Sequence, residues 1–174
     1  TDFVFTDKAP NTGVGLTYID HLTHNVKRGE MATWADFYTN LFNFREVRYF
    51  DIEGKLTGLK SKAMTSPCGK IRIPINESSD DKSQIEEFIR RYNGEGIQHI
   101  ALGTDNIYNT VKALRGSGVD FQETVETYYE KLDTRVPNHG EDVGTMKHLN
   151  ILVDGAPTKG QGLLLQIFTK DAIG

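Results

Sequence analysis

The fold is decided by two short stretches, Tyr18-Ile-Asp-His-Leu-Thr23 and Gly96-Ile-Gln-His-Ile-Ala101. Each has a histidine in its fourth position with apolar residues nearby, and the numbers of the two histidines, His21 and His99, differ by 78. That period is too long for a solenoid repeat and suits one small module that occurs twice. We therefore predict an α+β fold of two βαβββ modules, whose sheets pair into an open half-barrel around a cavity.

Periodicity around these stretches predicts the remaining elements. In the first module we expect strands at 18–26, 44–52, 59–65 and 71–76, a helix at 31–42, and turns at Gly54, Gly58 and Gly69. A connecting helix at 83–92 follows. In the second module we expect strands at 97–103, 119–122, 149–153 and 163–169, a helix at 107–115 and a helical insertion at 124–135. The predicted division is a linker at 1–16, a first module at 17–93, and a second module at 94–174 that lacks its C-terminal strand and helix.

Composition narrows the classes of partner. The chain has 174 residues, 20 basic and 24 acidic, and a net charge of -4, so no basic excess favours nucleic acid. Neither a membrane span of ~20 apolar residues nor a signal peptide is visible. One cysteine, Cys68, fits a reducing compartment, so we expect the cytoplasm. The oligomeric state is left open, a homo-oligomer included.

The five histidines differ in their prospects as metal ligands. His21 and His99 occupy equivalent positions in the opening strands of the two modules, so a pseudo-twofold arrangement would bring both to one cavity. His24 lies three positions from His21 and points to the opposite face of the strand, which suits a surface residue or one that supports the site. His139 and His148 flank a glycine-rich, charged stretch and are expected to be solvated.

Two imidazoles need at least one more ligand to hold a divalent ion. A carboxylate would complete the 2-His-1-carboxylate set of non-haem Fe(II) oxygenases. The last predicted strand, Leu163-Leu-Leu-Gln-Ile-Phe-Thr169, contains no carboxylate, and Asp171 lies just beyond it. Imidazole also accepts cobalt, nickel and zinc, so two histidines do not select iron.

Five segments, in order and with matching spacing, resemble the 4-hydroxyphenylpyruvate dioxygenase family, specifically its C-terminal catalytic half. They are Asp20-His21, Ile73-Pro-Ile-Asn-Glu77, Lys82-Ser-Gln-Ile85, Gly96-Ile-Gln-His-Ile-Ala-Leu102 and Leu164-Leu-Gln-Ile-Phe-Thr-Lys170. The resemblance covers the chain from about Tyr18 onward and implies the vicinal oxygen chelate fold.

The resemblance also implies a function and a set of site residues. His21 and His99 would be Fe(II) ligands, and the third ligand would be a Glu in a strand after Gly174. Such an enzyme converts an aromatic 2-oxo acid, 4-hydroxyphenylpyruvate, and O2 to homogentisate and CO2 in tyrosine and phenylalanine catabolism. The residues that would surround this substrate are Ser61, Asn76, Gln84, Gln98 and Gln166. Without the third ligand, we expect weak iron binding and impaired catalysis from the 174 residues.

Three alternatives stay open. A 4-hydroxymandelate synthase would use the same substrate and metal but attack the benzylic carbon. A glyoxalase or extradiol-type enzyme of the same fold would normally have Glu or His where this chain has Gln166. A metal-free binding module of the fold would need no iron. In each case the neutral amides of Asn76 and Gln98 could simply satisfy strand ends.

Overall fold

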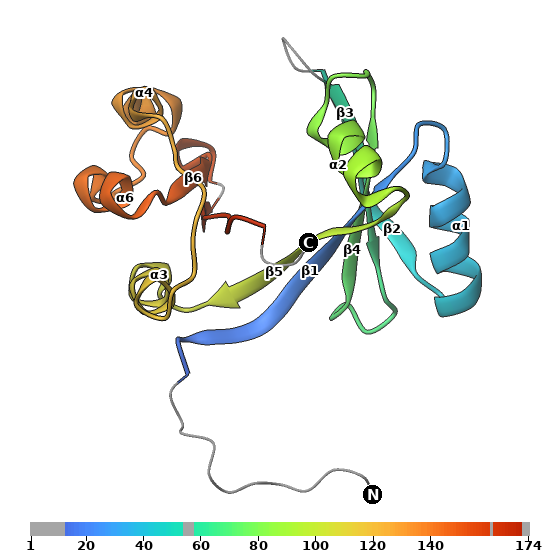
Figure 1. Ribbon diagram of the computed structural model, residues 1–174, viewed down its shortest axis with the longest axis horizontal. Coiled ribbons are helices and arrows are strands. Elements are labelled where there is room, and N and C mark those ends of the chain that lie inside the picture. The colour runs from blue at the N-terminus through green and yellow to red at the C-terminus, as the bar shows by residue number, and fades with distance from the viewer. Residues whose placement is uncertain (1–12, 54–57, 161, 172–174) are drawn as a thin grey trace, which may run out of the picture. The chain divides into compact units, whose positions relative to one another are not determined.

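A computed structural model describes residues 13–53, 58–160 and 162–171 (Figure 1). Most of the predicted linker, residues 1–12, and the predicted turn at Gly54 lie outside these ranges. The chain divides into two compact units: Thr17–Gly103, and Thr104–Gly174 together with the N-terminal residues through Leu16. Within the described ranges, no helix combines the length and the apolar character that crossing a membrane requires.

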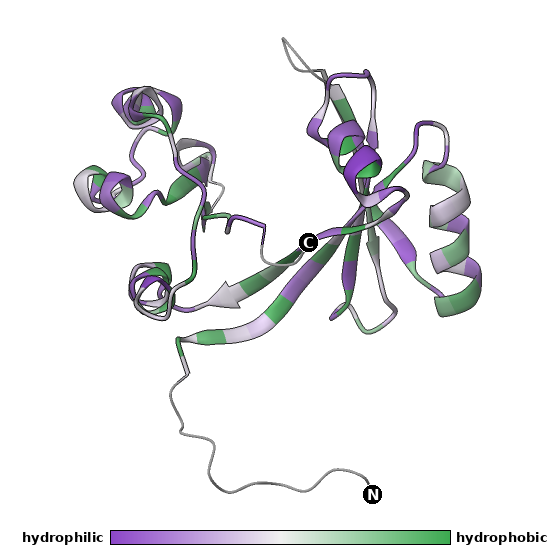
Figure 2. Cartoon of the chain, in the orientation of Figure 1, coloured by the Kyte–Doolittle hydropathy of each residue, from purple (hydrophilic) through white to green (hydrophobic). Residues whose placement is uncertain are grey.

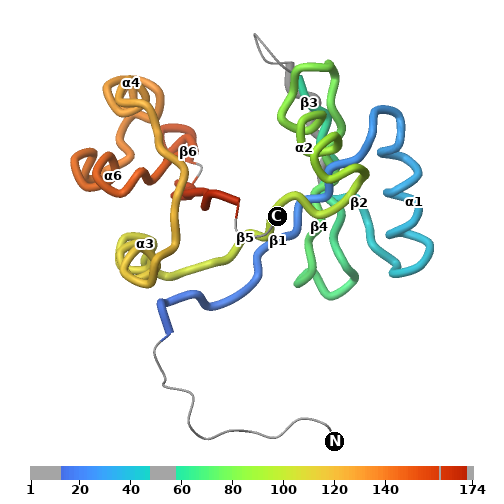
Figure 3. Tube along the Cα trace, viewed as in Figure 1, coloured from blue at the N-terminus to red at the C-terminus, as the bar shows by residue number. Residues whose placement is uncertain are grey.

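The unit Thr17–Gly103 is built on a five-stranded sheet of order β2-β3-β4-β1-β5. Strands β2, β3 and β4 are antiparallel neighbours, and β1 runs parallel to β4. Figure 3 follows the chain from β1 through α1 and the three strands to α2. The predicted strand, helix and three strands are therefore confirmed. The bounds are β1 Leu16–Val26, α1 Met31–Phe42, β2 Arg45–Glu53, β3 Gly58–Thr65, β4 Arg72–Ser78, α2 Gln84–Tyr92 and β5 Gly96–Thr104.

Helix α1 covers one face of this sheet (Figure 1). The core between them contains Val26 of β1, Met64 of β3 and Ile75 of β4, with Ala35 of the helix. Side chains alternate between the two faces of a strand. Because Val26 faces the helix, the odd-numbered residues of β1, including His21, lie on the face away from α1. Figure 2 shows this mixture of hydrophobic and hydrophilic residues along β1.

The apolar stripe of α1 is narrower than its sequence predicts. Trp34 and Tyr38 pack partly buried against the core, whereas Phe37 and Leu41 are exposed. The helix ends at Asn43, whose left-handed backbone turns the chain so that the next N–H, from Phe44, donates to the carbonyl of Tyr38 at 3.2 Å.

The other unit has its own core and departs further from the prediction. The predicted insertion at 124–135 is confirmed as two short helices, but the predicted strand at 119–122 is reduced to one bridge between Phe121 and Thr169. Helix α6 is not predicted at all. Because it extends through Leu149, the strand expected at 149–153 begins only at Leu152. The bounds are α3 Ile107–Gly116, α4 Glu126–Glu130, α5 Leu132–Arg135, α6 Val143–Leu149, β6 Leu152–Gly155, η1 Pro157–Lys159 and β7 Leu163–Gln166.

Strand β5 was predicted to open the second module. In the structure it lies beside β1 in the sheet of the unit Thr17–Gly103. This position brings the two histidine-bearing strands next to each other. The division of the chain into modules at residue 94 stays a prediction.

Candidate metal centre

The two histidines singled out by the repeat meet on neighbouring strands. The Nε2 atoms of His21 and His99 are 3.3 Å apart. Their rings are inclined at 74° with centroids 5.4 Å apart. Both side chains are only partly buried. The arrangement directs two imidazole donors to one point.

The opposite nitrogen of each ring is held by an oxygen acceptor. Nδ1 of His21 lies 2.8 Å from Oδ2 of Asp20, and Nδ1 of His99 lies within hydrogen-bond distance of Oε1 of Gln98. A carboxylate or amide oxygen only accepts, so these contacts assign the proton of each neutral ring to Nδ1. Metal-binding histidines commonly donate their remaining N–H to such an acceptor.

This assignment leaves lone pairs on both Nε2 atoms. Two lone pairs facing each other at 3.3 Å repel, and a cation between or beside them removes the repulsion. The hydroxyl of buried Thr23 is 2.9 Å from Nε2 of His99 and can donate one hydrogen bond to it. Burial, reinforced by any charge on His21, lowers the pKa of His99 and keeps it in the neutral form that binds metal. The donor set therefore fits a divalent metal ion.

A complete ligand set is not present in the described part of the chain. There, no group of three or more His, Cys, Asp or Glu side chains could hold a metal ion. Asp171, considered as a substitute carboxylate, is exposed and belongs to the other compact unit. The described residues thus bring two candidate ligands together without a third.

The face of the sheet that carries His21 also carries neutral polar side chains. Strand parity puts Thr23 and Asn25 on this face of β1. Asn25 is in register with Asn76 of β4, which is in register with Ser61 of β3. Ser61 and Asn76, predicted from the resemblance to contact substrate, therefore form a row with Asn25.

Asn25 was missed by the sequence analysis. It is buried, and among the described residues its Oδ1 has no hydrogen-bond partner. A buried acceptor left unpaired costs ~1–3 kcal/mol. The signal that could have found it is the two-residue period of the strand, which continues from His21 through Thr23 to Asn25.

The three predicted glutamines lie in different places. Gln98 contacts His99, as described. Gln84 is the exposed first residue of α2, after the capping Ser83. Gln166 is half-buried in β7, in register with Leu152, and belongs to the other compact unit. Their predicted contact with substrate remains a prediction.

Two expectations for the other histidines are wrong. His24 was expected at the surface or supporting the site, but it is buried against α1, where its Nδ1 lies 3.0 Å from the hydroxyl of Tyr38. His139 was expected to be solvated but is buried. His148 is exposed, as expected.

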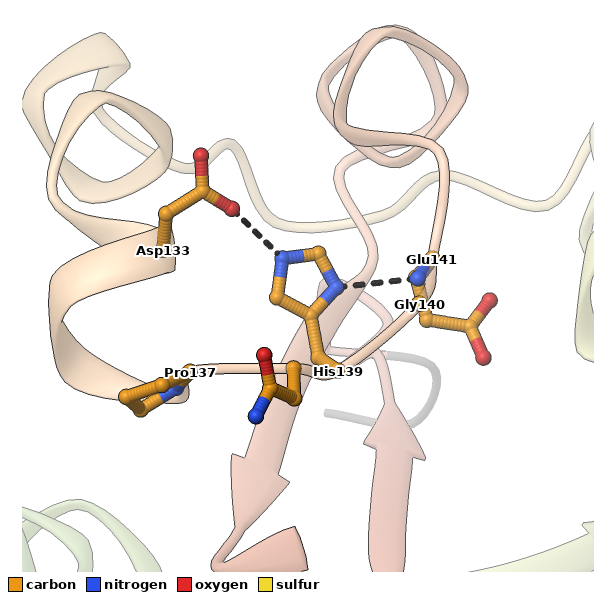
Figure 4. Close-up of a pocket in the computed structure, with 6 residues that line it drawn as sticks. Asp133, Pro137, His139, Gly140 and Glu141 are labelled. Atoms are coloured by element: carbon orange, nitrogen blue, oxygen red, sulfur yellow. Dashed lines mark hydrogen bonds and ion pairs between the residues drawn. The ribbon is translucent and has the colours of Figure 1, made fainter. Parts of the chain in front are cut away.

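A cavity of about 530 Å³ lies beside His139 in the other unit (Figure 4). Both ring nitrogens are engaged: Nε2 lies 2.9 Å from Oδ1 of Asp133, and Nδ1 accepts the backbone N–H of Glu141 at 3.0 Å. The Glu141 carboxylate in turn accepts the hydroxyl of Tyr108 at 2.6 Å. These two contacts leave no nitrogen of His139 for a ligand.

The strand order and the paired imidazoles define a class of protein: an α+β protein with a βαβββ module in which two histidines meet on adjacent strands. The family model described as Glyoxalase/Bleomycin resistance protein/Dioxygenase superfamily matches residues 18–136. The chain belongs to this superfamily, which confirms the predicted fold class.

Particular relatives narrow the comparison. The chain is 66% identical to a 4-hydroxyphenylpyruvate dioxygenase of Pseudomonas aeruginosa and 68% identical to the Vibrio vulnificus protein Hemolysin VllY, over 99% of this chain and 49% of each relative. A mutant of 4-hydroxymandelate synthase from Streptomyces coelicolor has a similar structure, with a TM-score of 0.77 and 26% identity, over 90% of this chain and 44% of that one. The chain spans about half the length of the curated relatives it matches.

Proposed function

We propose that this chain carries part of the Fe(II) centre of a dioxygenase that converts 4-hydroxyphenylpyruvate and O2 to homogentisate and CO2, a cytoplasmic step of tyrosine catabolism. The observation that carries the proposal is the 3.3 Å approach of the Nε2 atoms of His21 and His99. The identity of 66% with a 4-hydroxyphenylpyruvate dioxygenase supports this choice of substrate.

In this proposal the protein's task at the metal is positional. When bound, Fe(II) would supply the oxygen chemistry. His21 and His99 hold the ion through Nε2, while Asp20 and Gln98 fix the ring orientations through Nδ1. The hydroxyl of Thr23 must turn away from Nε2 of His99 as the metal enters, because one lone pair serves one partner.

The proposed substrate-binding residues are neutral. Ser61 and Asn76, adjacent in register, offer hydroxyl and amide groups to the phenol end of the substrate. Gln84, Gln98 and Gln166 are proposed to orient the ring and the keto acid. Neutral amides can align a carboxylate without competing with the metal for its charge.

A metal titration tests the two ligands. Anaerobic titration with Fe(II), and with Co(II) as a spectroscopic probe, is carried out on the 174-residue chain and on His21→Ala, His99→Ala and His148→Ala. We expect both ligand variants to lose metal binding, and the exposed His148 variant to bind as the wild type does. Equal affinity in all four proteins would refute the metal centre.

A turnover assay tests the reaction. The 174-residue chain and a form extended past Gly174 through the next Glu are supplied with Fe(II), O2 and 4-hydroxyphenylpyruvate. We expect the extension to raise iron affinity sharply and to allow homogentisate formation with one CO2 per O2 consumed. Formation of 4-hydroxymandelate would instead favour the activity of the structural neighbour named above. No turnover and no gain in iron affinity in the extended form would refute the dioxygenase.

A further inference from the structure

We propose that Arg72 is a positioning residue of the metal centre, acting on His21 through Asp20. The inference deepens the proposed function and depends on its metal site. Arg72 is the first residue of β4, the strand next to β1. Its Nη1 donates to Oδ1 of Asp20 at 2.6 Å, while Oδ2 of the same carboxylate is 2.8 Å from Nδ1 of His21.

These two contacts use both oxygens of one carboxylate. The guanidinium fixes the plane of the Asp20 carboxylate from one side, so Oδ2 is kept in place to accept the His21 N–H. Without Arg72, Asp20 could rotate about its side-chain bonds and turn its carboxylate toward water, since the Asp20 side chain is 37% exposed. The His21 ring would then lose the contact that holds Nε2 toward His99.

The two halves of the site differ in this respect. His99 is held by the neutral amide of Gln98, a neighbour in sequence, and its Nε2 also contacts Thr23. His21 is held by a charged carboxylate that is anchored to a different strand. A carboxylate behind an imidazole increases its basicity as a ligand. Arg72 therefore ties the orientation of the stronger donor to the pairing of β1 with β4.

The charge of Arg72 has an opposing effect that an experiment can separate. A guanidinium near the site repels a divalent cation, so removing that charge would tighten metal binding. Arg72 is half-exposed, and solvent and salt screen such repulsion over about 10 Å at 0.1 M ionic strength. Positioning through two short hydrogen bonds is not screened in this way. We therefore expect the loss of positioning to outweigh the loss of repulsion, so that replacing Arg72 weakens metal binding.

The test is a Co(II) titration of the wild type, Arg72→Gln, Arg72→Lys, Asp20→Asn and the double variant, at low and high salt. Arg28→Gln is the matched control, because the Arg28 side chain is about as exposed as that of Arg72 and forms an ion pair with Asp81 at 2.5 Å. Supporting partners of ligating histidines typically change metal affinity 10–100-fold. We expect about tenfold weaker binding in Arg72→Gln, a smaller loss in Arg72→Lys, and no change in Arg28→Gln.

Two further results are expected if Arg72 acts through Asp20. Arg72→Gln has no additional effect in the Asp20→Asn background, and the Co(II) absorption spectrum changes in both single variants. Tighter binding in Arg72→Gln, or affinity equal to that of Arg28→Gln, would overturn the inference while leaving the metal centre intact. Absence of Co(II) binding both by the 174-residue wild type and by the form extended past Gly174 would overturn the proposed function and this inference together.

Discussion

Replacing Asn25 with leucine should not destabilise the protein. The two side chains have the same branching and number of heavy atoms, and Oδ1 of Asn25 is buried with no partner among the described residues. Removing this unpaired acceptor relieves ~1–3 kcal/mol, and fitting two methyl groups into an amide site costs part of it. We expect a net gain in unfolding free energy of about 1 kcal/mol, which raises Tm by roughly 2–4 °C in a chain of this size.

Differential scanning calorimetry measures this change directly. Asn25→Asp is the matched control: it has the same shape but adds a buried charge, and we expect it to lower Tm. A fall in Tm of about 2 °C or more in Asn25→Leu would refute the reasoning, because it would mean that the carboxamide makes a stabilising contact. If the gain is observed, the natural Asn25 makes the protein less stable than leucine would at a position beside the proposed site. Such a cost is common where function constrains a residue.

Two further predictions concern the core around α1. Burial lowers the pKa of His24 below its usual 6.5, although the charge of Glu95 opposes this effect. As the pH falls, His24 is therefore protonated in the unfolded chain before it is protonated in the folded protein. The folded state loses stability as the pH drops below about 6.5. Urea unfolding measured from about pH 7 to 5 should show a smaller loss of unfolding free energy in His24→Phe than in the wild type or in His148→Phe. An equal dependence of stability on pH in all three proteins would contradict this prediction. Buried Glu77 accepts the first N–H of α1, from Met31, at 3.0 Å, so Glu77→Ala should cost about 1–2 kcal/mol. Glu77→Gln keeps a side-chain oxygen that can accept this hydrogen bond, so it should lose less unfolding free energy than Glu77→Ala. An equal loss in the two variants would argue against a stabilising role of the hydrogen bond.

The first module could be predicted because its periodic pattern agrees with its packing. The helix at 31–42 has the predicted bounds, and the four strands of the first module differ from their predicted ranges by at most two residues at each end. Long amphipathic elements bury one face wherever they pack, so their type is visible in the sequence. The exposed Phe37 and Leu41 show the limit of this argument. Apolar residues at helical spacing identify a helix, but the neighbouring strands decide which of them are covered.

The other unit was predicted less well because its elements are short. Helix α6 has seven residues, and its start depends on a local cap in which the side chain of Asp142 accepts the N–H of Thr145. Isolated helices of this length are unstable, so burial of Met146 and Leu149 in the core decides the structure. His139 illustrates the same point: its partner Asp133 is six residues away, and nothing in the charged, glycine-rich context indicates that the ring is buried.

The candidate metal centre could be predicted only in part, for a related reason. Internal repetition selects His21 and His99, because equivalent positions in a repeated module carry equivalent roles. Arg72 becomes relevant only through the pairing of β1 with β4, two strands separated by a helix and two other strands. No local pattern specifies that register.

The same register couples stability to the proposed function. On β1, Val26 packs into the α1 core while His21 and Thr23 occupy the opposite face. A slip of one residue would exchange the two faces, placing His21 in the core and Val26 on the polar face. The apolar contacts beneath α1 therefore do more than hold the helix in place. By fixing the register of β1 against β4, they determine that an imidazole, and not an aliphatic side chain, faces His99.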